Sequence, residues 1–293
     1  MNARKGNKMK KNATNCINKT EELDFEEMYD RTLNVEAIDH KILDIPYGNN
    51  ERNRLDLFYP AEEKEKYPLI VFFHGGALIK GDKRRYQLKP ALNGINKGYV
   101  VASVNYRLIQ HAPYPAFNED AIQALRYLKE NAEKYRIDGN HICVWGESAG
   151  AYLAMVAGFS QEVQVVIDWY GYTDFAKVEF ANQKGNEFTQ IAKAASTLNE
   201  ATFNEKGIKL EELMKEARIE NYIREKIPAV FIEHGTSDPL IPYQQSKDLY
   251  EDLRKKIDER SELHLVEGGV HGVEGYSNKE NLDLVFGFID KWI

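Results

Sequence analysis

Ile142-Cys-Val-Trp-Gly-Glu-Ser-Ala-Gly-Ala151 joins a short apolar run to an Ala/Leu/Met-rich run through one serine flanked by small residues. The pattern predicts a buried strand, a very sharp turn at Ser148 and then a helix. Gly146 and Gly150 stand two residues before and after the serine, where a side chain would clash because strand and helix nearly touch. The first amides of the helix would face any negative charge that develops near the serine hydroxyl. The pattern therefore predicts a nucleophile elbow, against the alternative of a glycine-flanked serine in an ordinary loop.

Strands and helices are expected to alternate on both sides of this stretch. Apolar runs predict strands at residues 68–73, 99–104, 141–145, 163–170, 229–234 and 262–266. Helices are expected at residues 84–97, 117–135, 243–257 and 282–292. Residues 41–47 and 53–59 alternate apolar and polar side chains and predict a two-strand hairpin. Because continuous apolar runs are typical of strands buried on both faces, the predicted class is α/β, with a mostly parallel sheet flanked by helices.

Two segments stand apart from this alternation. Residues 1–22 are rich in Lys, Asn and Thr and are predicted to be a disordered tail, followed by an acidic helix within residues 23–39. Residues 23–293 are expected to form one domain. The segment from about residue 174 to 224 is polar and helical in pattern without a strand signal, which predicts an insertion that serves as a cap or lid. The alternative is a solvated helical decoration with no role.

Composition excludes several classes of function. The 293 residues carry a formal net charge of −7, and no basic stripe offsets it, so a nucleic-acid partner is not expected. The basic start lacks the apolar core of a signal peptide, and no apolar run is long enough to span a bilayer. Cys16 and Cys143 are expected to be free thiols in a reducing compartment. These observations predict a cytoplasmic protein, a monomer or homodimer, with no membrane partner.

A serine hydroxyl needs a base that takes its proton, and the chain has seven histidines. His271 lies in the Gly-rich segment Glu267-Gly-Gly-Val-His-Gly272, where a loop after the last strand can carry an imidazole to the sheet edge. His271 is therefore the predicted base. Structural roles are predicted for the histidines in a turn or strand, namely His74, His234 and His264. No partner pattern marks the other three, which are His40, His111 and His141.

The base in turn needs a carboxylate that holds its tautomer and stabilises the imidazolium. Asp238 follows an apolar strand in the turn Gly235-Thr-Ser-Asp-Pro239, and the resulting chain order Ser, Asp, His is one of the known orders of catalytic triads. Asp174, just after the preceding strand, is the alternative acid, whereas Asp168 lies within that strand and is predicted to be structural. Asp238 could also be a turn-capping aspartate, because Asp-Pro favours turns by itself.

A Gly-rich turn after the strand at 68–73 predicts donors for an oxyanion. His74-Gly-Gly-Ala77 has little side chain and can direct backbone N–H groups at a ligand. The amides of Gly76 and Ala77 are the expected donors, with Gly75 shaping the turn. A third amide is expected from Ala149, beside the nucleophile. The alternative is a plain turn.

Taken together, these motifs resemble the α/β-hydrolase fold, and within it the hormone-sensitive-lipase-like carboxylesterases and the xylan- and feruloyl-esterase-type enzymes. Besides the elbow, the matching segments occur in family order over residues 42–293: His74-Gly-Gly-Ala77, Asn105-Tyr-Arg-Leu108, Pro113-Tyr-Pro-Ala116 before Asp120, Tyr170-Gly-Tyr-Thr-Asp174, His234-Gly-Thr-Ser-Asp-Pro239 and Gly268-Gly-Val-His-Gly272. Ala77 departs from the pattern, since many relatives have Gly or an aromatic residue there. Residues 175–221 match nothing in the family.

The resemblance implies a catalytic triad of Ser148, Asp238 and His271 and an oxyanion hole that involves Gly76, Ala77 and Ala149. It implies a serine carboxylesterase that works through an acyl-enzyme on small-molecule esters. The polar composition of the insertion favours short-chain, acetyl-type acyl groups, with carbohydrate esters among the candidates. No metal or organic cofactor is expected. Two alternatives are an amidase or formamidase with the same triad, and a catalytically inactive binding protein on the same fold.

Overall fold

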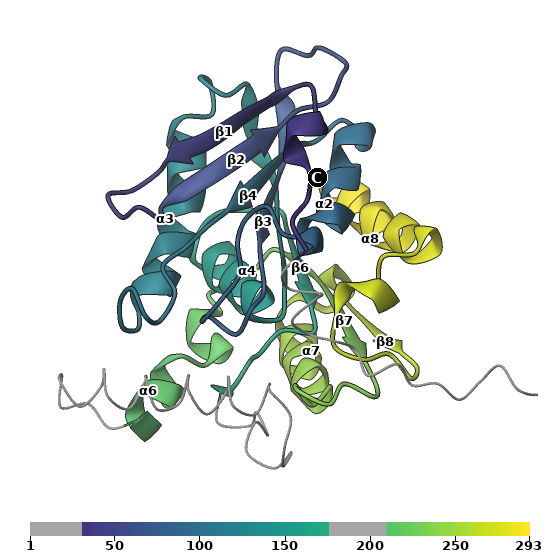
Figure 1. Ribbon diagram of the computed structural model, residues 1–293. Helices are drawn as coiled ribbons and strands as arrows, with labels where there is room; N and C mark the ends of the chain where they lie inside the picture. The colour runs from purple at the N-terminus through teal and green to yellow at the C-terminus, as the bar shows by residue number, and fades with distance from the viewer. Residues whose placement is uncertain (1–30, 176–209) are drawn as a thin grey trace, which may run out of the picture.

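An eight-stranded sheet forms the centre of the molecule in the computed structural model, which describes residues 31–175 and 210–293. The strands are β1 (Lys41–Pro46), β2 (Arg54–Phe58), β3 (Tyr67–Phe73), β4 (Val100–Val104), β5 (Ile137–Glu147), β6 (Val165–Trp169), β7 (Ala229–Gly235) and β8 (Ser261–Val266). They lie in the order β1-β2-β4-β3-β5-β6-β7-β8 (Figure 1). Strands β1, β2 and β4 pair antiparallel, and all other neighbours pair parallel. The predicted hairpin and the mostly parallel sheet are confirmed.

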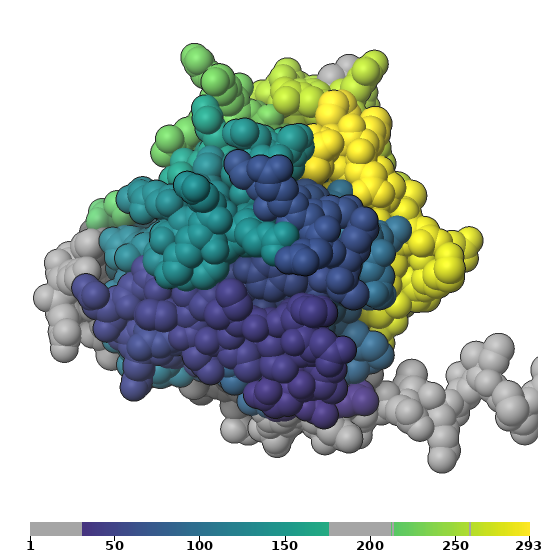
Figure 2. All heavy atoms as spheres, turned by 90° about the horizontal axis from the view of Figure 1, so that it is seen from above, coloured from purple at the N-terminus to yellow at the C-terminus, as the bar shows by residue number. Residues whose placement is uncertain are grey.

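Helices connect the parallel strands and cover both faces of the sheet. The α-helices are α2 (Lys89–Leu92), α3 (Ala116–Glu130), α4 (Ala149–Ser160), α6 (Leu210–Glu216), α7 (Gln244–Ile257) and α8 (Lys279–Trp292). Short 3-10 helices are η1 (Val35–Ala37), η2 (Tyr86–Leu88), η3 (Asn93–Lys97), η5 (Ile219–Tyr222), η6 (Asp258–Arg260) and η7 (Val273–Gly275). In Figure 2 the N-terminal strands, in purple, cover one side of the molecule, and the C-terminal helix, in yellow, lies on another. In the part of the chain described here, no helix combines the length and the apolar character needed to cross a membrane.

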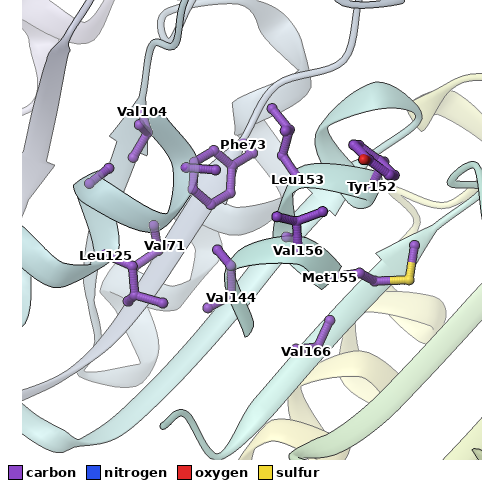
Figure 3. Close-up of a cluster of buried hydrophobic side chains, with 14 of the residues drawn as sticks. Val71, Phe73, Val104, Leu125, Val144, Tyr152, Leu153, Met155, Val156 and Val166 are labelled. Atoms are coloured by element: carbon purple, nitrogen blue, oxygen red, sulfur yellow. The ribbon is translucent and has the colours of Figure 1, made fainter. Parts of the chain in front are cut away.

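Two hydrophobic cores lie on opposite faces of the sheet. Alternate residues of each strand point to opposite faces, so that Val71 of β3 belongs to the core under α3, α4 and α7, and Phe72 belongs to the core under α2 and α8. Figure 3 shows the first core, where Val71, Val144 and side chains of α4 meet. Burial on both faces explains why these strands are continuous apolar runs in the sequence.

The structure corrects two predicted helices. Residues 84–97 do not form one helix but the succession η2, α2 and η3. Pro90 lies in the first turn of α2, where it has no N–H to donate, and so it starts a helix rather than continuing one. Within the described part of residues 23–39, only the 3-10 helix η1 is found in place of the predicted helix. The predicted tail at 1–22 and most of the predicted lid, residues 176–209, lie outside the described residues.

A buried ion-pair network fixes the segment that follows the Gly-Gly turn. Lys83, 4% exposed, lies 3.4 Å from the buried carboxylate of Asp56 in β2 and 2.8 Å from the solvent-exposed carboxylate of Asp44 in β1. Arg84 also binds Asp56, with Nε 2.6 Å from Oδ2. Nearby, Asn105 Oδ1 accepts the backbone N–H of Lys83 at 2.7 Å. The hairpin therefore anchors the loop that carries the predicted oxyanion donors.

Glu233 of β7 is an acid buried between the sheet and α8. Its side chain is 1% exposed, and its Oε2 accepts a hydrogen bond from Asn281 Nδ2 of α8 at 2.9 Å. Burial raises the pKa of Glu233 to about 7, against the opposing effect of the hydrogen bond from Asn281. The carboxyl group therefore holds its proton in the folded chain at pH values where the unfolded chain has lost it.

Compared with wild type, the variant Glu233→Gln is expected to be stabilised more at pH 8 than at pH 5. A raised carboxyl pKa means that wild-type stability falls as the pH rises from about 4.5 to about 7. Glutamine keeps an oxygen acceptor for Asn281 and does not titrate, so the difference in unfolding free energy between variant and wild type should grow by roughly 2–3 kcal/mol. Urea unfolding of both proteins at pH 5 and pH 8 measures it. An equal difference at the two pH values would contradict the prediction.

Candidate active site

Ser148 occupies the sharp turn between β5 and α4, as the elbow motif predicts. Its backbone has φ 54° and ψ −122°, a region that non-glycine residues rarely adopt. A Cβ at Gly146 would lie 2.1 Å from the carbonyl oxygen of Gly150, so strand and helix do approach too closely for a side chain. The backbone N–H of Ser148 donates to the carbonyl of Trp169 in β6 at 2.9 Å, which ties the strained turn to the sheet.

Gly150→Ala is expected to destabilise the fold by about 3 kcal/mol or more, because the added Cβ would lie 2.0 Å from the backbone oxygen of Phe73. Moving a backbone atom of a central strand would disturb the hydrogen bonds of the sheet and would cost free energy of folding. Gly287→Ala is the matched control, since Gly287 is exposed in α8 with no atom within 4 Å of the new methyl group. That variant should gain about 1 kcal/mol from helix propensity. Chemical denaturation measures both, and equal effects of the two substitutions would contradict the prediction.

His271 is brought to Ser148 by the loop after β8. Its Nε2 lies 2.8 Å from Ser148 Oγ, and its Nδ1 lies 2.7 Å from Asp238 Oδ2. Because a carboxylate only accepts hydrogen bonds, Nδ1 carries the hydrogen and Nε2 is free to accept the serine proton. The imidazole is 1% exposed and packs edge-on against the ring of Tyr170 at 4.8 Å. The geometry is that of a nucleophile, a base and an orienting acid in hydrogen-bond contact.

Asp238 lies in the turn after β7 and receives four hydrogen bonds. Oδ1 accepts the backbone N–H groups of Leu240 and Ile241 at 2.8 and 3.0 Å. Oδ2 accepts from His271 and, at 3.1 Å, from Nε2 of His234. Burial alone would raise the pKa of Asp238, but the two histidines outweigh it and hold the pKa well below its usual range. The carboxylate is therefore charged at neutral pH. Asp174, the alternative acid, instead pairs with Arg218 at 3.2 Å.

The Gly-Gly turn after β3 carries Gly76 and Ala77, two of the residues predicted to donate to an oxyanion. Gly76 and Ala77 have φ angles of 110° and 54°, so this turn lies in the left-handed region. Within residues 31–175 and 210–293, the amides of Gly76, Ala77 and Ala149 have no hydrogen-bond acceptor. The N–H of Gly75 is different, because it donates to Glu147 Oε1 at 2.8 Å. Gly75 thus shapes the turn without a free donor.

Glu147, the residue before Ser148, has a role that the sequence does not predict. It is buried, and its Oε2 accepts a hydrogen bond from the phenol of Tyr170 at 2.7 Å. Burial raises its pKa, opposed by that hydrogen bond and by the charge of His271. One carboxyl group therefore links the Gly-Gly turn to the ring that contacts His271. Its place in the Gly-Glu-Ser-Ala-Gly motif was visible, but partners 72 and 23 residues away were not.

Other predicted structural residues have the expected partners. His74 Nδ1 lies 2.7 Å from the carbonyl oxygen of Gly75, and its ring stacks on Tyr106 at 4.4 Å. Burial lowers the pKa of His74 to about 4, so this imidazole is neutral. Asp168 accepts the N–H of Gly171 at 2.9 Å, and burial raises its pKa to about 6. In the described part of the chain, no group of three or more His, Cys, Asp or Glu side chains could hold a metal ion.

Comparison with known proteins identifies relatives. Residues 55–253, more than half of the chain, match the family model described as BD-FAE. The esterase LipQ of Mycobacterium tuberculosis is 26% identical over 228 residues, which are 72% of this chain and 52% of LipQ. The isoprenylcysteine alpha-carbonyl methylesterase ICME of Arabidopsis thaliana is 27% identical over 253 residues, covering 78% of this chain and 55% of that protein. The chain thus spans about half the length of the curated relatives it matches.

Solved structures share the fold. A truncated form of a carbohydrate esterase from gut microbiota superposes with a TM-score of 0.73 at 22% identity, covering 89% of this chain and 99% of that one. A bifunctional GH43-CE protein of Bacteroides eggerthii has a TM-score of 0.72 at 24% identity, covering 86% of this chain and 35% of that one. The sheet order and these superpositions confirm the α/β-hydrolase fold expected from the motifs. With residues 55–253 matched to its model, the chain belongs to the BD-FAE family.

Proposed function

We propose that this chain is a serine carboxylic-ester hydrolase that works through an acyl-enzyme. Ser148 is the nucleophile, His271 the base and Asp238 the acid that orients it. The observation that carries the proposal is the buried hydrogen-bond chain from Ser148 Oγ through His271 to Asp238, with distances of 2.8 and 2.7 Å. The printed names of the relatives, an esterase and a methylesterase, agree with it.

In the first half of the reaction, Ser148 Oγ attacks the ester carbonyl carbon while His271 Nε2 accepts the serine proton. The C–O bond to the alcohol then breaks, and the alcohol leaves with the proton from Nε2. In the second half, water gives a proton to Nε2 as its oxygen attacks the acyl carbon. The bond from that carbon to Ser148 Oγ then breaks, Oγ takes the proton back from Nε2, and the carboxylic acid leaves. The charge of Asp238 stabilises the imidazolium that forms in each half.

Negative charge develops on the carbonyl oxygen in each tetrahedral intermediate. The donors we assign to this oxygen are the amides of Gly76 and Ala77, in the turn after β3, and the amide of Ala149, which follows Ser148 in the chain. Because Ala149 begins α4, the helix dipole adds to its effect. A donor of this kind contributes about 2.7–4 kcal/mol of transition-state stabilisation in a water-poor site.

We propose short-chain, acetyl-type esters as substrates, with esters of carbohydrates among them. Bulky rings lie near the nucleophile: Tyr172, 2% exposed, interacts through its hydroxyl with Ser148 and stacks on Phe175 at 5.2 Å. Tyr152 packs edge-on against Phe175 at 4.9 Å. Such rings favour a small acyl group over a long flexible chain. The carbohydrate esterase among the solved structures agrees with the carbohydrate part of the proposal.

Hydrolysis of p-nitrophenyl esters with two, four and eight carbons tests the reaction and the acyl preference together. We expect kcat/KM to be highest for the two-carbon ester and to fall toward eight carbons. Acetylated xylo-oligosaccharides would then test the carbohydrate part. An eight-carbon preference would contradict short-chain specificity while leaving the triad intact.

Matched formanilides and aryl esters separate this proposal from the amidase alternative. A higher kcat/KM on the formanilide would assign the triad to C–N bonds instead. If neither substrate class turns over and an active-site fluorophosphonate fails to label Ser148, the proposal is wrong, and a non-catalytic binding role replaces it.

A further inference from the structure

A second histidine contacts the carboxylate that orients the base. His234 lies in β7, four residues before Asp238, and its side chain is fully buried. Its Nε2 lies 3.1 Å from Asp238 Oδ2 and 2.9 Å from the carbonyl oxygen of Ile241. Its Nδ1 lies 2.7 Å from the hydroxyl oxygen of Ser246 in α7. Both ring nitrogens therefore have protein partners.

These partners determine where the imidazole hydrogen is. A carboxylate oxygen and a backbone carbonyl oxygen can only accept hydrogen bonds, so Nε2 of His234 must carry a hydrogen that both share. Nδ1 can then accept the hydrogen of the Ser246 hydroxyl, which donates as well as accepts. A neutral His234 satisfies every contact in this arrangement. The opposite tautomer would leave Nε2 facing two acceptors with no hydrogen between them.

The contact falls on the same oxygen that His271 uses. Asp238 Oδ2 accepts from His271 at 2.7 Å and from His234 at 3.1 Å, while Oδ1 is held by two backbone amides. The backbone amides fix one end of the carboxylate, and His234 restricts rotation of the other end. Each hydrogen-bond donor also reduces the negative charge that Asp238 presents to His271. Asp168 of β6 is a further buried acid whose charge interacts with His234.

We propose that His234 is a positioning residue for the reaction: its Nε2–H holds Asp238 Oδ2 in line with His271 and moderates the charge that His271 experiences. The inference rests on the function proposed above, because it assigns His234 an effect through the same triad. It also changes the role of a residue whose strand position suggested only structural hydrogen bonding.

Two polar substitutions separate the donor from the rest of the side chain. In His234→Gln the amide nitrogen reaches about as far as Nε2, so a donor to Asp238 is kept. In His234→Asn the amide lies near the position of Nδ1, so the contact with Ser246 can be kept while Asp238 loses its donor. We expect His234→Asn to lower kcat by roughly 10-fold or more with KM within about threefold, and His234→Gln to restore most of the loss.

The dependence of kcat/KM on pH distinguishes a positioning role of His234 from a merely structural one. Without the His234 donor, Asp238 keeps more charge for the protonated form of His271. The acid limb of kcat/KM should therefore move to higher pH in His234→Asn, by roughly half a unit or more, and stay near wild type in His234→Gln. His264→Gln is the control, because His264 of β8 stacks on Phe231 of β7 at 4.6 Å; this variant should change neither kcat nor the acid limb.

The outcomes distinguish this inference from the proposed function. Wild type and Ser148→Ala are assayed beside the variants, so absence of Ser148-dependent activity in wild type overturns both proposals. If wild type is active and the asparagine variant matches the glutamine variant in kcat and in pH profile, only the role of His234 is wrong. Long-range ¹H–¹⁵N NMR correlations of the wild-type imidazoles require no variant to fold. An Nε2–H tautomer for His234 supports the proposal, and an Nδ1–H tautomer overturns it.

Discussion

Replacing Ser148 with alanine is expected to lower kcat for ester hydrolysis by roughly 10³- to 10⁶-fold. The substitution removes the oxygen that would attack the carbonyl and leaves His271 and the three backbone donors in place. Residual hydrolysis would come from water oriented by those groups. Kinetics with p-nitrophenyl acetate measure the loss, and mass spectrometry of a rapidly quenched reaction should show an acyl group on wild type only.

The fold should tolerate this substitution. Alanine faces the same positive φ as serine, and the backbone hydrogen bond from residue 148 to Trp169 remains. Its thermal unfolding midpoint should therefore stay close to that of wild type. Ser160→Ala, at the other end of α4, is the matched control and should keep full activity. A Ser148→Ala variant with more than about a tenth of wild-type kcat would exclude Ser148 as the nucleophile.

Asp238→Asn is expected to lower kcat by roughly 10³- to 10⁴-fold, the second-largest effect of a single substitution. An amide group that turns its NH₂ toward His271 Nδ1 forces the hydrogen onto Nε2, where it blocks acceptance of the serine proton. An amide also carries no charge to stabilise the imidazolium. The KM should change little, because Asp238 lies behind the base and does not contact the ester.

Asp174→Asn is the control that separates the two candidate acids. The side chain of Asp174 pairs with Arg218 rather than with His271, so we expect kcat within about threefold of wild type. Steady-state kinetics of both variants at pH 8 give the comparison. A larger loss for Asp174→Asn than for Asp238→Asn would reverse the assignment of the acid.

Much of the fold is predictable because burial leaves a direct signal in the sequence. Strand β3 and the stretch Ile142–Trp145 of β5 are covered on both faces, so their residues are apolar, and each appears as a continuous run. Ser148 is equally visible, because the turn around it excludes side chains at Gly146 and Gly150. His271 and Asp238 are found by topology, since loops at the carboxyl ends of parallel strands meet at one edge of the sheet.

The directions of individual side chains leave no comparable signal in the sequence. That Glu147 occupies the N–H of Gly75, and that His234 reaches Asp238, depends on side-chain directions that no local pattern encodes. Pro90 is the sequence feature that marks the break of the helix expected at residues 84–97. Residues 176–209 match no family motif and lie outside the described residues, so the lid expected at about residues 174–224 stays a prediction.

Ser148 and His271 lie 123 residues apart in the chain, on loops that follow β5 and β8. Their meeting therefore requires the last strand to dock on the sheet, and contacts of such long sequence separation form slowly. Trp145 and Trp169 pack against each other at 5.0 Å within the central strands, and Trp145 also packs on Phe286 of the C-terminal helix α8 at 5.8 Å. During refolding, native tryptophan fluorescence and enzymatic turnover should therefore both recover only after the C-terminal part of the chain has docked on the sheet.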